Sequence, residues 1–337
     1  MNNSVKVSIN QISDYHLAMN FKNNRFTLKS ASPLVFGLLI GVFGEMTAPG
    51  INAQEISQYQ YWLELSAADQ IYADRTAEIG RTDAFREFLG QRSIVFREGR
   101  GPVDALEEYR STNYTQDELT WESHYIDVSL SGDLGLTAGP FVASDAGLED
   151  GQFFYGHLVS VWKKNNEAWE LMADMAVSIP GFLRLNVEPN FDDTRPVIEE
   201  TAKPMAAAFE DNNMQSLIDA DNLFGQSINF RGGERALLRY GLETTRVYLP
   251  GMAPSAGPEA SSVYGAYLDA QLSTTNPISL MHMGGFLSDS KEMGYTYGVM
   301  ETNTDAGEPG FRAGYLRLWR FKDNGEWGVA VEVLGPL

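Results

Sequence analysis

The stretch "DLGLTAG" (residues 133–139) returns later in the chain as "EMGYTYG" (residues 292–298). Both begin with an acid and an apolar residue, and both place a threonine between two glycines. The first glycines of the two stretches, Gly135 and Gly294, lie 159 positions apart (294 minus 135). A phrase that recurs at such a distance is typical of a duplicated structural unit. The sequence therefore predicts two related domains in one chain.

Two further pairs of phrases occur in the same order. "FLGQRSIVFREG" (residues 88–99) is matched by "LFGQSINFRGG" (residues 223–233), and "LVSVWKKNNEAWELMAD" (residues 158–174) by "YLRLWRFKDNGEWGVAVE" (residues 315–332). On this alignment the offset grows from 134 (231 minus 97) to 157 (319 minus 162). We therefore expect extra residues in the second copy, as a long loop in the Gly- and Pro-rich residues 247–266.

Each copy is expected to begin with helices and to continue in strands. Apolar residues at helical spacing mark the helices, and β-branched and aromatic residues between turn signals mark the strands. In the first copy the predicted helices are residues 66–80, 81–90 and 101–110, and the first predicted strand is residues 93–97. Helices that cover one face of an antiparallel sheet make an α+β domain.

The two domains are predicted at residues 54–190 and 191–337. Polar residues and prolines interrupt the apolar pattern at residues 186–196, which is where we place the boundary. The last strands are apolar on both faces, and such a strand must be covered on both sides. We therefore expect the domains to pack sheet to sheet, as an internal pseudo-dimer with approximate two-fold symmetry.

Residues 1–53 stand apart from both domains. Three basic residues precede an apolar run at residues 34–43, and small residues follow it up to Ala53, as in a secretory signal peptide. The run is shorter than the roughly 20 residues that a membrane-spanning helix needs, so no stable membrane anchor is expected. We expect export to a periplasm or the medium, with cleavage near Ala53 and translation from Met1 or Met19. The alternative is a buried helix of the fold.

The composition excludes several classes of function. The formal net charge is −20, and no basic stripe is present that would neutralise the phosphates of a nucleic acid. The chain has no cysteine, which rules out disulfides and thiolate chemistry. No glycine-rich phosphate or dinucleotide motif occurs, so no cofactor is expected. Of the histidines after the leader, His124, His157 and His282, none has metal-ligand spacing with another, so no metal site is expected.

Each copy resembles the nuclear transport factor 2-like superfamily, which includes SnoaL-like polyketide cyclases and ketosteroid isomerases. The first copy matches it over most of residues 65–180, and the second, at about residues 194–337, matches it more loosely. The resemblance lies in "SGDLGLTAG" (residues 131–139) followed by "YGHLVSVWKK" (residues 155–164) and a later tryptophan, and it is strongest to an uncharacterised, often exported branch. It implies two tandem cone-like domains, each a curved antiparallel sheet covered by N-terminal helices. In the isomerase relatives the carboxylate base lies at about the position of Arg97 and Arg231, so arginine here counts against isomerase chemistry.

An acid lies among apolar residues in the last strand of each copy. Strict alternation puts Asp174 on one face with Met172, and Glu332 on one face with Ala330. A carboxyl with apolar neighbours has a raised pKa, which suits general acid–base catalysis. The candidate catalytic residues are Asp174 and His157. The alternative is an acid that faces solvent or pairs with a nearby arginine.

Arg97 and Arg231 each end a predicted strand of Ser-Ile-x-Phe-Arg. Because this phrase recurs together with the acid, we expect Arg97 to pair with Asp174, and Arg231 with Glu332, inside each cone. An adjacent cation lowers the pKa of a carboxyl, which favours binding a polar group over donating a proton. With these two arginines and Glu332, the candidate ligand-binding residues are Tyr109, His124, Tyr155, His282, Tyr297 and Tyr315.

Three functions remain open from the sequence. The leading one is an exported binding protein that holds a small apolar or amphipathic ligand in a cone-shaped pocket. The second is a cofactor-independent isomerase, cyclase or hydrolase that uses a strand-borne carboxylate. The third is a structural or interaction module in which side chains fill the pockets.

Overall fold

The structure is a computed structural model. It describes residues 53–97, 99–111, 118–145, 152–166, 168–186, 209–271, 277–302 and 310–337. Residues 1–52, which carry the predicted signal peptide, lie outside these ranges. The stretch after residue 186, where the domain boundary is predicted, lies outside them as well.

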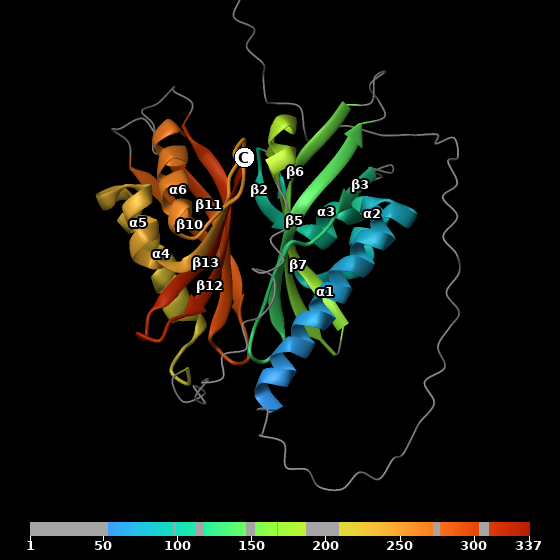
Figure 1. The fold of residues 1–337 in the computed structure, drawn as a ribbon, viewed down its shortest axis with the longest axis horizontal. Coiled ribbons are helices and arrows are strands. Elements are labelled where there is room, and N and C mark those ends of the chain that lie inside the picture. The colour runs from blue at the N-terminus through green and yellow to red at the C-terminus, as the bar shows by residue number, and fades with distance from the viewer. Residues whose placement is uncertain are drawn as a thin grey trace, which may run out of the picture.

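The first domain places helices over one face of a seven-stranded sheet (Figure 1). The sheet order is β2-β1-β7-β6-β5-β3, with β4 also paired to β5, and of the described strand pairs in this sheet only β1–β7 is parallel. The helices are α1 (Ala53–Ile79), α2 (Arg81–Phe88), α3 (Ala105–Ser111) and the 3-10 helix η1 (Gly181–Asn186). The strands are β1 (Leu89–Arg97), β2 (Gly101–Asp104), β3 (Glu118–Trp121), β4 (Tyr125–Val128), β5 (Leu134–Asp145), β6 (Gln152–Asn165) and β7 (Ala168–Ile179).

The second domain repeats this layout with a six-stranded sheet of order β10-β11-β12-β13-β8-β9. The helices are α4 (Met214–Arg231), α5 (Gly233–Tyr240) and α6 (Pro258–Gln271). The strands are β8 (Gly241–Tyr248), β9 (Ser255–Ala256), β10 (Ile278–Leu287), β11 (Met293–Thr302), β12 (Arg312–Phe321) and β13 (Trp327–Pro336). The predicted fold class, two tandem cone-like α+β domains, is confirmed.

One of the aligned phrases is a false match. Residues 227–231, "SINFR", form the end of α4 rather than a strand, because Asn213 caps this helix and buried Leu217, Phe224 and Ile228 follow at helical spacing. The second-domain partner of β1 is β8. Since Val95 pairs with Asp174 and Val247 pairs with Glu332, the offset there is 152 (247 minus 95), not 134.

Three predicted elements differ in the structure. The expected loop at residues 247–266 contains β9 and most of α6. α1 begins at Ala53, well before Ser66. Residues 101–104 form strand β2 rather than the start of a helix, and Pro102 is tolerated there because β2 is an edge strand.

A β-bulge in each last strand changes which residues share a face. In β7 the register with β6 shifts between Leu171 and Ala173, and in β13 the register with β12 shifts between Val329 and Val331. The inserted residues, Met172 and Ala330, therefore lie on the opposite face from the acids two positions later. The expectation that each acid shares a face with this neighbour is wrong.

The two sheets face each other, and the α-helices lie on the outer sides (Figure 1). One hydrophobic cluster contains residues of both sheets, with Val161 and Met175 from the first and Leu316 and Val331 from the second. Two arginines also reach across. Arg92 lies 4.1 Å from the ring centroid of Phe286, and Arg246 lies 4.5 Å from that of Tyr125.

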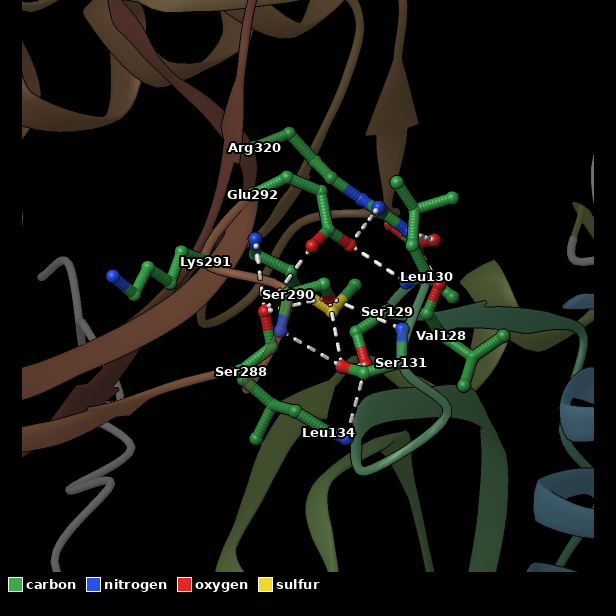
Figure 2. A network of polar contacts seen from close by, with 12 residues as sticks. Val128, Ser129, Leu130, Ser131, Leu134, Ser288, Ser290, Lys291, Glu292 and Arg320 are labelled. Carbon is green, nitrogen blue, oxygen red and sulfur yellow. Dashed lines mark hydrogen bonds and ion pairs between the residues drawn. The ribbon is translucent and has the colours of Figure 1, made fainter. Parts of the chain in front are cut away.

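The turns that lead into the repeated stretches touch each other, as Figure 2 shows. The hydroxyl oxygens of Ser131 and Ser290 are 2.7 Å apart. Each hydroxyl also accepts a hydrogen bond from the backbone N–H of the other residue, at 3.1 Å. The contact is thus reciprocal.

A second set of two reciprocal hydrogen bonds lies beside the two serines. The N–H of Leu130 donates to Glu292 (2.7 Å), and the N–H of Asp289 donates to Asp133 (3.1 Å). Both residue pairs, Leu130 with Asp289 and Asp133 with Glu292, are related by an offset of 159 (289 minus 130, 292 minus 133). Contacts that exchange partners in this way are typical of an isologous interface.

Candidate functional site

A buried polar centre lies between the helices and the sheet of each domain. In the first domain the Thr137 hydroxyl donates to Asp69 of α1 (2.7 Å) and accepts from the indole N–H of Trp162 (3.0 Å). All three side chains are buried. Burial raises the pKa of Asp69, although hydrogen bonds from Ser123, Thr137 and Trp121 act to lower it.

The second domain repeats the same three residue types. The Thr296 hydroxyl donates to Asp221 of α4 (3.1 Å) and accepts from Trp319 (2.9 Å). The threonines are those of the two repeated stretches, so the stretch recurs because each copy joins a helix to two strands through it. The final glycines, Gly139 and Gly298, are needed for close approach, since a Cβ there would stand about 2 Å from a carbonyl oxygen of the neighbouring chain segment.

Asp174 lies beside this centre in the first domain. The Tyr72 hydroxyl donates to it at 3.3 Å, the Ser160 hydroxyl donates at 3.4 Å, and the Arg81 guanidinium lies 3.8 Å away. Burial raises the pKa of Asp174 to about 6, against the lowering effect of Arg81 and Tyr72. The carboxyl therefore changes charge close to neutral pH.

Glu332 holds the equivalent place in the second domain, but its surroundings differ. Arg317 binds it with two hydrogen bonds (2.5 and 3.0 Å) and also donates to Asp221 (2.7 Å). Burial raises the pKa of Glu332 although Arg317 acts to lower it, while Asp221, despite its burial, has a lowered pKa through Arg317, His282 and Tyr315. All three charged side chains are fully buried.

The cation comes from a different element in each domain. Ser160 pairs with Asp174 in the strand register, and Arg317 pairs with Glu332, so Arg317 stands where the first domain has Ser160. The first domain instead takes its cation from Arg81, the first residue of α2. The side chain of Arg317 is 0% exposed, whereas that of Arg81 is 25% exposed.

The arginine pairs expected from the sequence do not form. Arg97 pairs with Glu108 of α3 (3.1 Å) and lies over the ring of Tyr109, 5.1 Å from its centroid. Arg231 is exposed in the last turn of α4. The expectation failed for Arg231 because its segment is helical, and for Arg97 because α3 supplies a nearer acid.

His157 does not share a face with Asp174. It alternates with Leu158 and lies on the side of the sheet that meets the second domain, with its ring centroid 5.7 Å from that of Tyr248. Burial, with a contribution from His124, lowers the pKa of His157 to about 4. A joint catalytic role of His157 and Asp174 is therefore not what the structure shows.

The other candidate residues are dispersed. Tyr315 donates to Asp221 (2.7 Å), and His282 Nδ1 lies 3.2 Å from the same carboxylate, so both belong to the second centre. Tyr109 is buried under α2, where its ring contacts Phe85. The remaining three lie elsewhere: His124 between β3 and β4, Tyr155 beside Gly181, and Tyr297 against the shared cluster of the two sheets.

Sequence analysis missed the residues that complete both centres. Asp69 and Asp221 lie within helices and Arg317 within a strand, where a charged residue has no motif to mark it. The available signal was the repeated threonine, whose polar side chain in an apolar strand requires a buried partner. Also missed were Tyr72, Arg81 and Tyr264, the last of which donates to Glu332 (3.2 Å).

Aromatic side chains pack against one another near Asp174. The ring centroid of Tyr72 lies 4.7 Å from that of Trp121, 5.1 Å from Phe88 and 5.8 Å from Trp162. A hollow of about 300 Å³ lies elsewhere, at the contact between the two turns. It is lined by Leu130, Ser131, Phe209, Glu210, Asp289, Ser290 and Lys291.

No family model and no curated protein matches the chain. Solved structures match little more than a third of it. A ketosteroid isomerase-like protein from Erwinia carotovora atroseptica SCRI1043 is 16% identical over 36% of this chain and 93% of its own, with a TM-score of 0.29. A nuclear transport factor 2-like protein of unknown function from Shewanella oneidensis MR-1 is 10% identical over 36% and 96%, also with a TM-score of 0.29. This chain is similar to both.

Within the residues that the structure describes, no helix combines the length and the hydropathy that a membrane span requires.

Proposed function

We propose that the protein binds a small apolar or amphipathic ligand in its first domain, and that the second domain is a structural support. The observation that carries this proposal is the contrast between Arg81 and Arg317. Arg317 is fully buried between two carboxylates, and breaking a buried ion pair costs about 3–5 kcal/mol. Arg81 is partly exposed and lies 3.8 Å from Asp174, so a ligand group can displace it at a much smaller cost.

The apolar wall of the proposed site comes from aromatic side chains of α1 and α2. The ring of Tyr72 lies next to those of Phe85 and Phe88, with centroid distances of 6.4 and 5.1 Å. Small-ligand sites commonly combine such walls with one or two polar groups that fix orientation. Here the polar groups are the Asp174 carboxyl and the Tyr72 hydroxyl.

The same carboxyl supports a second candidate, a cofactor-independent isomerase, cyclase or hydrolase. A pKa near 6 suits a group that both accepts and donates a proton at neutral pH. The close packing of Tyr72, Trp121 and Trp162 supports the third, a module with filled pockets.

The test uses the second domain as a guide. Ser160→Arg places an arginine where Arg317 stands, and we expect it to fill the site. The full chain is titrated with decanol, followed by saturation-transfer NMR and by the melting temperature, and Ser262→Arg, at an exposed position of α6, is the matched control. Binding that is lost only in Ser160→Arg supports the proposal. Absence of binding to the unmodified chain overturns it in favour of filled pockets.

A second measurement covers the case in which Ser160→Arg fails to fold. Asp174→Asn keeps the size of the side chain and removes its charge change, so decanol should still bind. Turnover of an enolisable ketone or an ester that is abolished in Asp174→Asn would instead support the enzyme.

We further propose that the two domains form an internal pseudo-dimer, which the reciprocal contacts of Ser131 with Ser290 support. Export with cleavage near Ala53 also remains a proposal. N-terminal sequencing of protein recovered from an exporting host should find a start near Gln54. Recovery of intact cytoplasmic protein would contradict it.

A further inference from the structure

Helix α1 has apolar side chains on two opposite faces. Its inner face includes buried Leu65 and Tyr72, which pack in the core of the first domain. The outer face of α1, on the outer side of this domain (Figure 1), exposes large apolar side chains as well. Tyr59 is 42% exposed, Leu63 45% and Ile71 58%. A helix that is apolar on more than one face is usually covered on each of them.

None of the exposed residues of α1 between positions 59 and 71 is charged. These exposed residues, here called the α1 stripe, are Tyr59, Gln60, Leu63, Ala67, Gln70 and Ile71. At the margin of the stripe, Glu64 pairs with Lys164 (2.8 Å). The chain as a whole has a net charge of −20, and two copies of so acidic a protein repel each other. An uncharged face is therefore where two copies can approach at the lowest electrostatic cost.

The α1 stripe is symmetric about position 65. The residue numbers of its members add up in pairs to 130, which couples Tyr59 with Ile71, Gln60 with Gln70, and Leu63 with Ala67. In an antiparallel pair of identical helices, a two-fold axis brings the two members of each pair together. Each pair joins compatible groups: a ring with an aliphatic chain, two carboxamides, and a leucine with an alanine that leaves room for it. The stripe is thus complementary to itself.

The apolar members of the stripe form one continuous row. They are spaced by four residues, and rows of this kind pack against each other in the commonest class of helix contact, at a crossing angle of about 50°. The row extends about 18 Å along the axis, at 1.5 Å per residue. A single row covers much less than the roughly 800 Å² per partner of a standard stable interface. A contact through it is therefore expected to be weak and dependent on concentration.

The second domain does not carry this stripe. Asp69 of α1 corresponds to Asp221 of α4, an offset of 152 (221 minus 69). At this offset the places of Tyr59, Leu63 and Ala67 are taken by polar residues, Asp211, Gln215 and Asp219. The last two are hydrogen-bonded to each other (2.8 Å). Since the fold forms with polar residues there, the fold itself does not require the apolar side chains of the α1 stripe.

We propose that the α1 stripe is the contact surface for a second copy of this chain, in an antiparallel, two-fold pair of α1 helices. The sheets meet within the chain, so the helix contact joins two chains through their first domains. The next exposed residue, Asp74, then falls opposite position 56 of the second copy, in the first turn of its α1. The helix dipole favours a negative charge at that place. This proposal does not depend on ligand binding.

The first test measures association of the full chain by sedimentation velocity, from about 1 μM to 1 mM, the range in which a small interface dissociates. We expect a monomer–dimer equilibrium. Ala67→Asp introduces the residue that α4 has at position 219 and places a charge against Leu63 of the other copy. This variant and Ile71→Gln should each weaken dimerisation about tenfold or more. Leu223→Gln, at the exposed position of α4 that corresponds to Ile71, is the matched control and should leave it unchanged.

The second test determines the register by cross-linking. The chain has no cysteine, so introduced thiols react only with each other. A mixture of Leu63→Cys chains and Ala67→Cys chains should form a disulfide-linked dimer on mild oxidation, because the two-fold pair places these positions opposite each other. The corresponding mixture on α4, Gln215→Cys with Asp219→Cys, is the control and should stay monomeric.

The outcomes decide between this surface and any other. A monomer at every concentration overturns the proposal. A dimer that Ala67→Asp and Ile71→Gln leave intact also overturns it, because the contact then lies elsewhere in the chain. Melting temperatures identify a variant that does not fold, and in that case the cross-linking decides. Decanol binding, the test of the proposed function, is measured separately, so either proposal can fail without the other.

Discussion

Ser131 and Ser290 lie 159 positions apart in the chain (290 minus 131), yet each accepts a hydrogen bond from the backbone N–H of the other. The same offset relates the two repeated stretches that follow these serines. The repeat in the sequence and the reciprocal contact in space therefore have one origin, the turn that leads into β5 and β11.

The reciprocal contact predicts energetic coupling between the two turns. Ser131→Ala and Ser290→Ala should each lower the free energy of unfolding by about 1 kcal/mol. Since both remove the same contact, the double variant should lose less than the sum, with a coupling of about 0.5 kcal/mol or more. Urea unfolding of the four proteins checks this. Strict additivity would show that the turns contribute independently.

We predict that the threonine of the buried polar centre, where it bridges an aspartate and a tryptophan, is required for stability in both domains. Thr137→Val and Thr296→Val keep the shape of the side chain but leave a carboxylate and an indole N–H without their shared partner. Each should reduce the free energy of unfolding by about 1–3 kcal/mol. Thr120→Val, on an exposed strand position, is the control and should change it by less than about 0.5 kcal/mol. An equal effect of all three variants would contradict the role of the centre.

We predict that replacing Arg317 lowers the free energy of unfolding much more than replacing a surface arginine. Arg317→Met leaves Asp221 and Glu332 buried without their shared cation, which should lower stability by about 3–5 kcal/mol. Arg239→Met removes an exposed pair with Glu326 and should cost less than about 1 kcal/mol. Chemical denaturation of both variants gives the comparison. Similar losses would mean that the buried network is not what stabilises the second domain.

Asp174 predicts a pH dependence of stability with a definite sign. Its pKa in the folded protein is about 6, above the ordinary 3.8, so the folded state binds the proton more tightly. Its contribution to stability is therefore present below about pH 4 and is lost as the pH rises through 6. The groups that face it are Tyr72, Arg81, Ser160 and Asp69.

The measurement is the difference in unfolding free energy between the unmodified chain and Asp174→Asn at several pH values. Asparagine does not titrate, so the variant should gain on the unmodified chain between pH 4 and pH 7, by up to about 3 kcal/mol. Groups that do not interact with Asp174, His157 among them, cancel in this difference. A difference that stays constant with pH would show that Asp174 keeps an ordinary pKa.

The sequence predicted the architecture better than the contacts. The repeated Gly–Thr–Gly pattern was sufficient to predict two domains because its threonine and its final glycine have the same structural role in both. The Ser-Ile-x-Phe-Arg pattern misled because the same letters suit a strand in one context and a helix end in another. In α4 the spacing of Leu217, Phe224 and Ile228 decides for the helix.

Simple alternation could not predict which residues of β7 and β13 share a face of the sheet. A bulge at Met172 and at Ala330 adds one residue, and nothing in the local sequence requires it there. The partner of Asp174 was also hidden, because Arg81 is far from it in sequence and reaches it only through the packing of α2 on the sheet. Such contacts depend on the distance between elements, which spacing in the sequence does not report.

The Ser160 and Arg317 positions show what joining the two halves in one chain makes possible. In a dimer of identical subunits every substitution appears twice, so an arginine that fills one cavity also fills its mate. When both halves are encoded in one chain this constraint is removed, because equivalent positions in the two halves can be substituted independently. One domain can then be stabilised by a buried guanidinium while the other keeps a serine at the equivalent position. The two domains can therefore take different roles, which identical subunits cannot do.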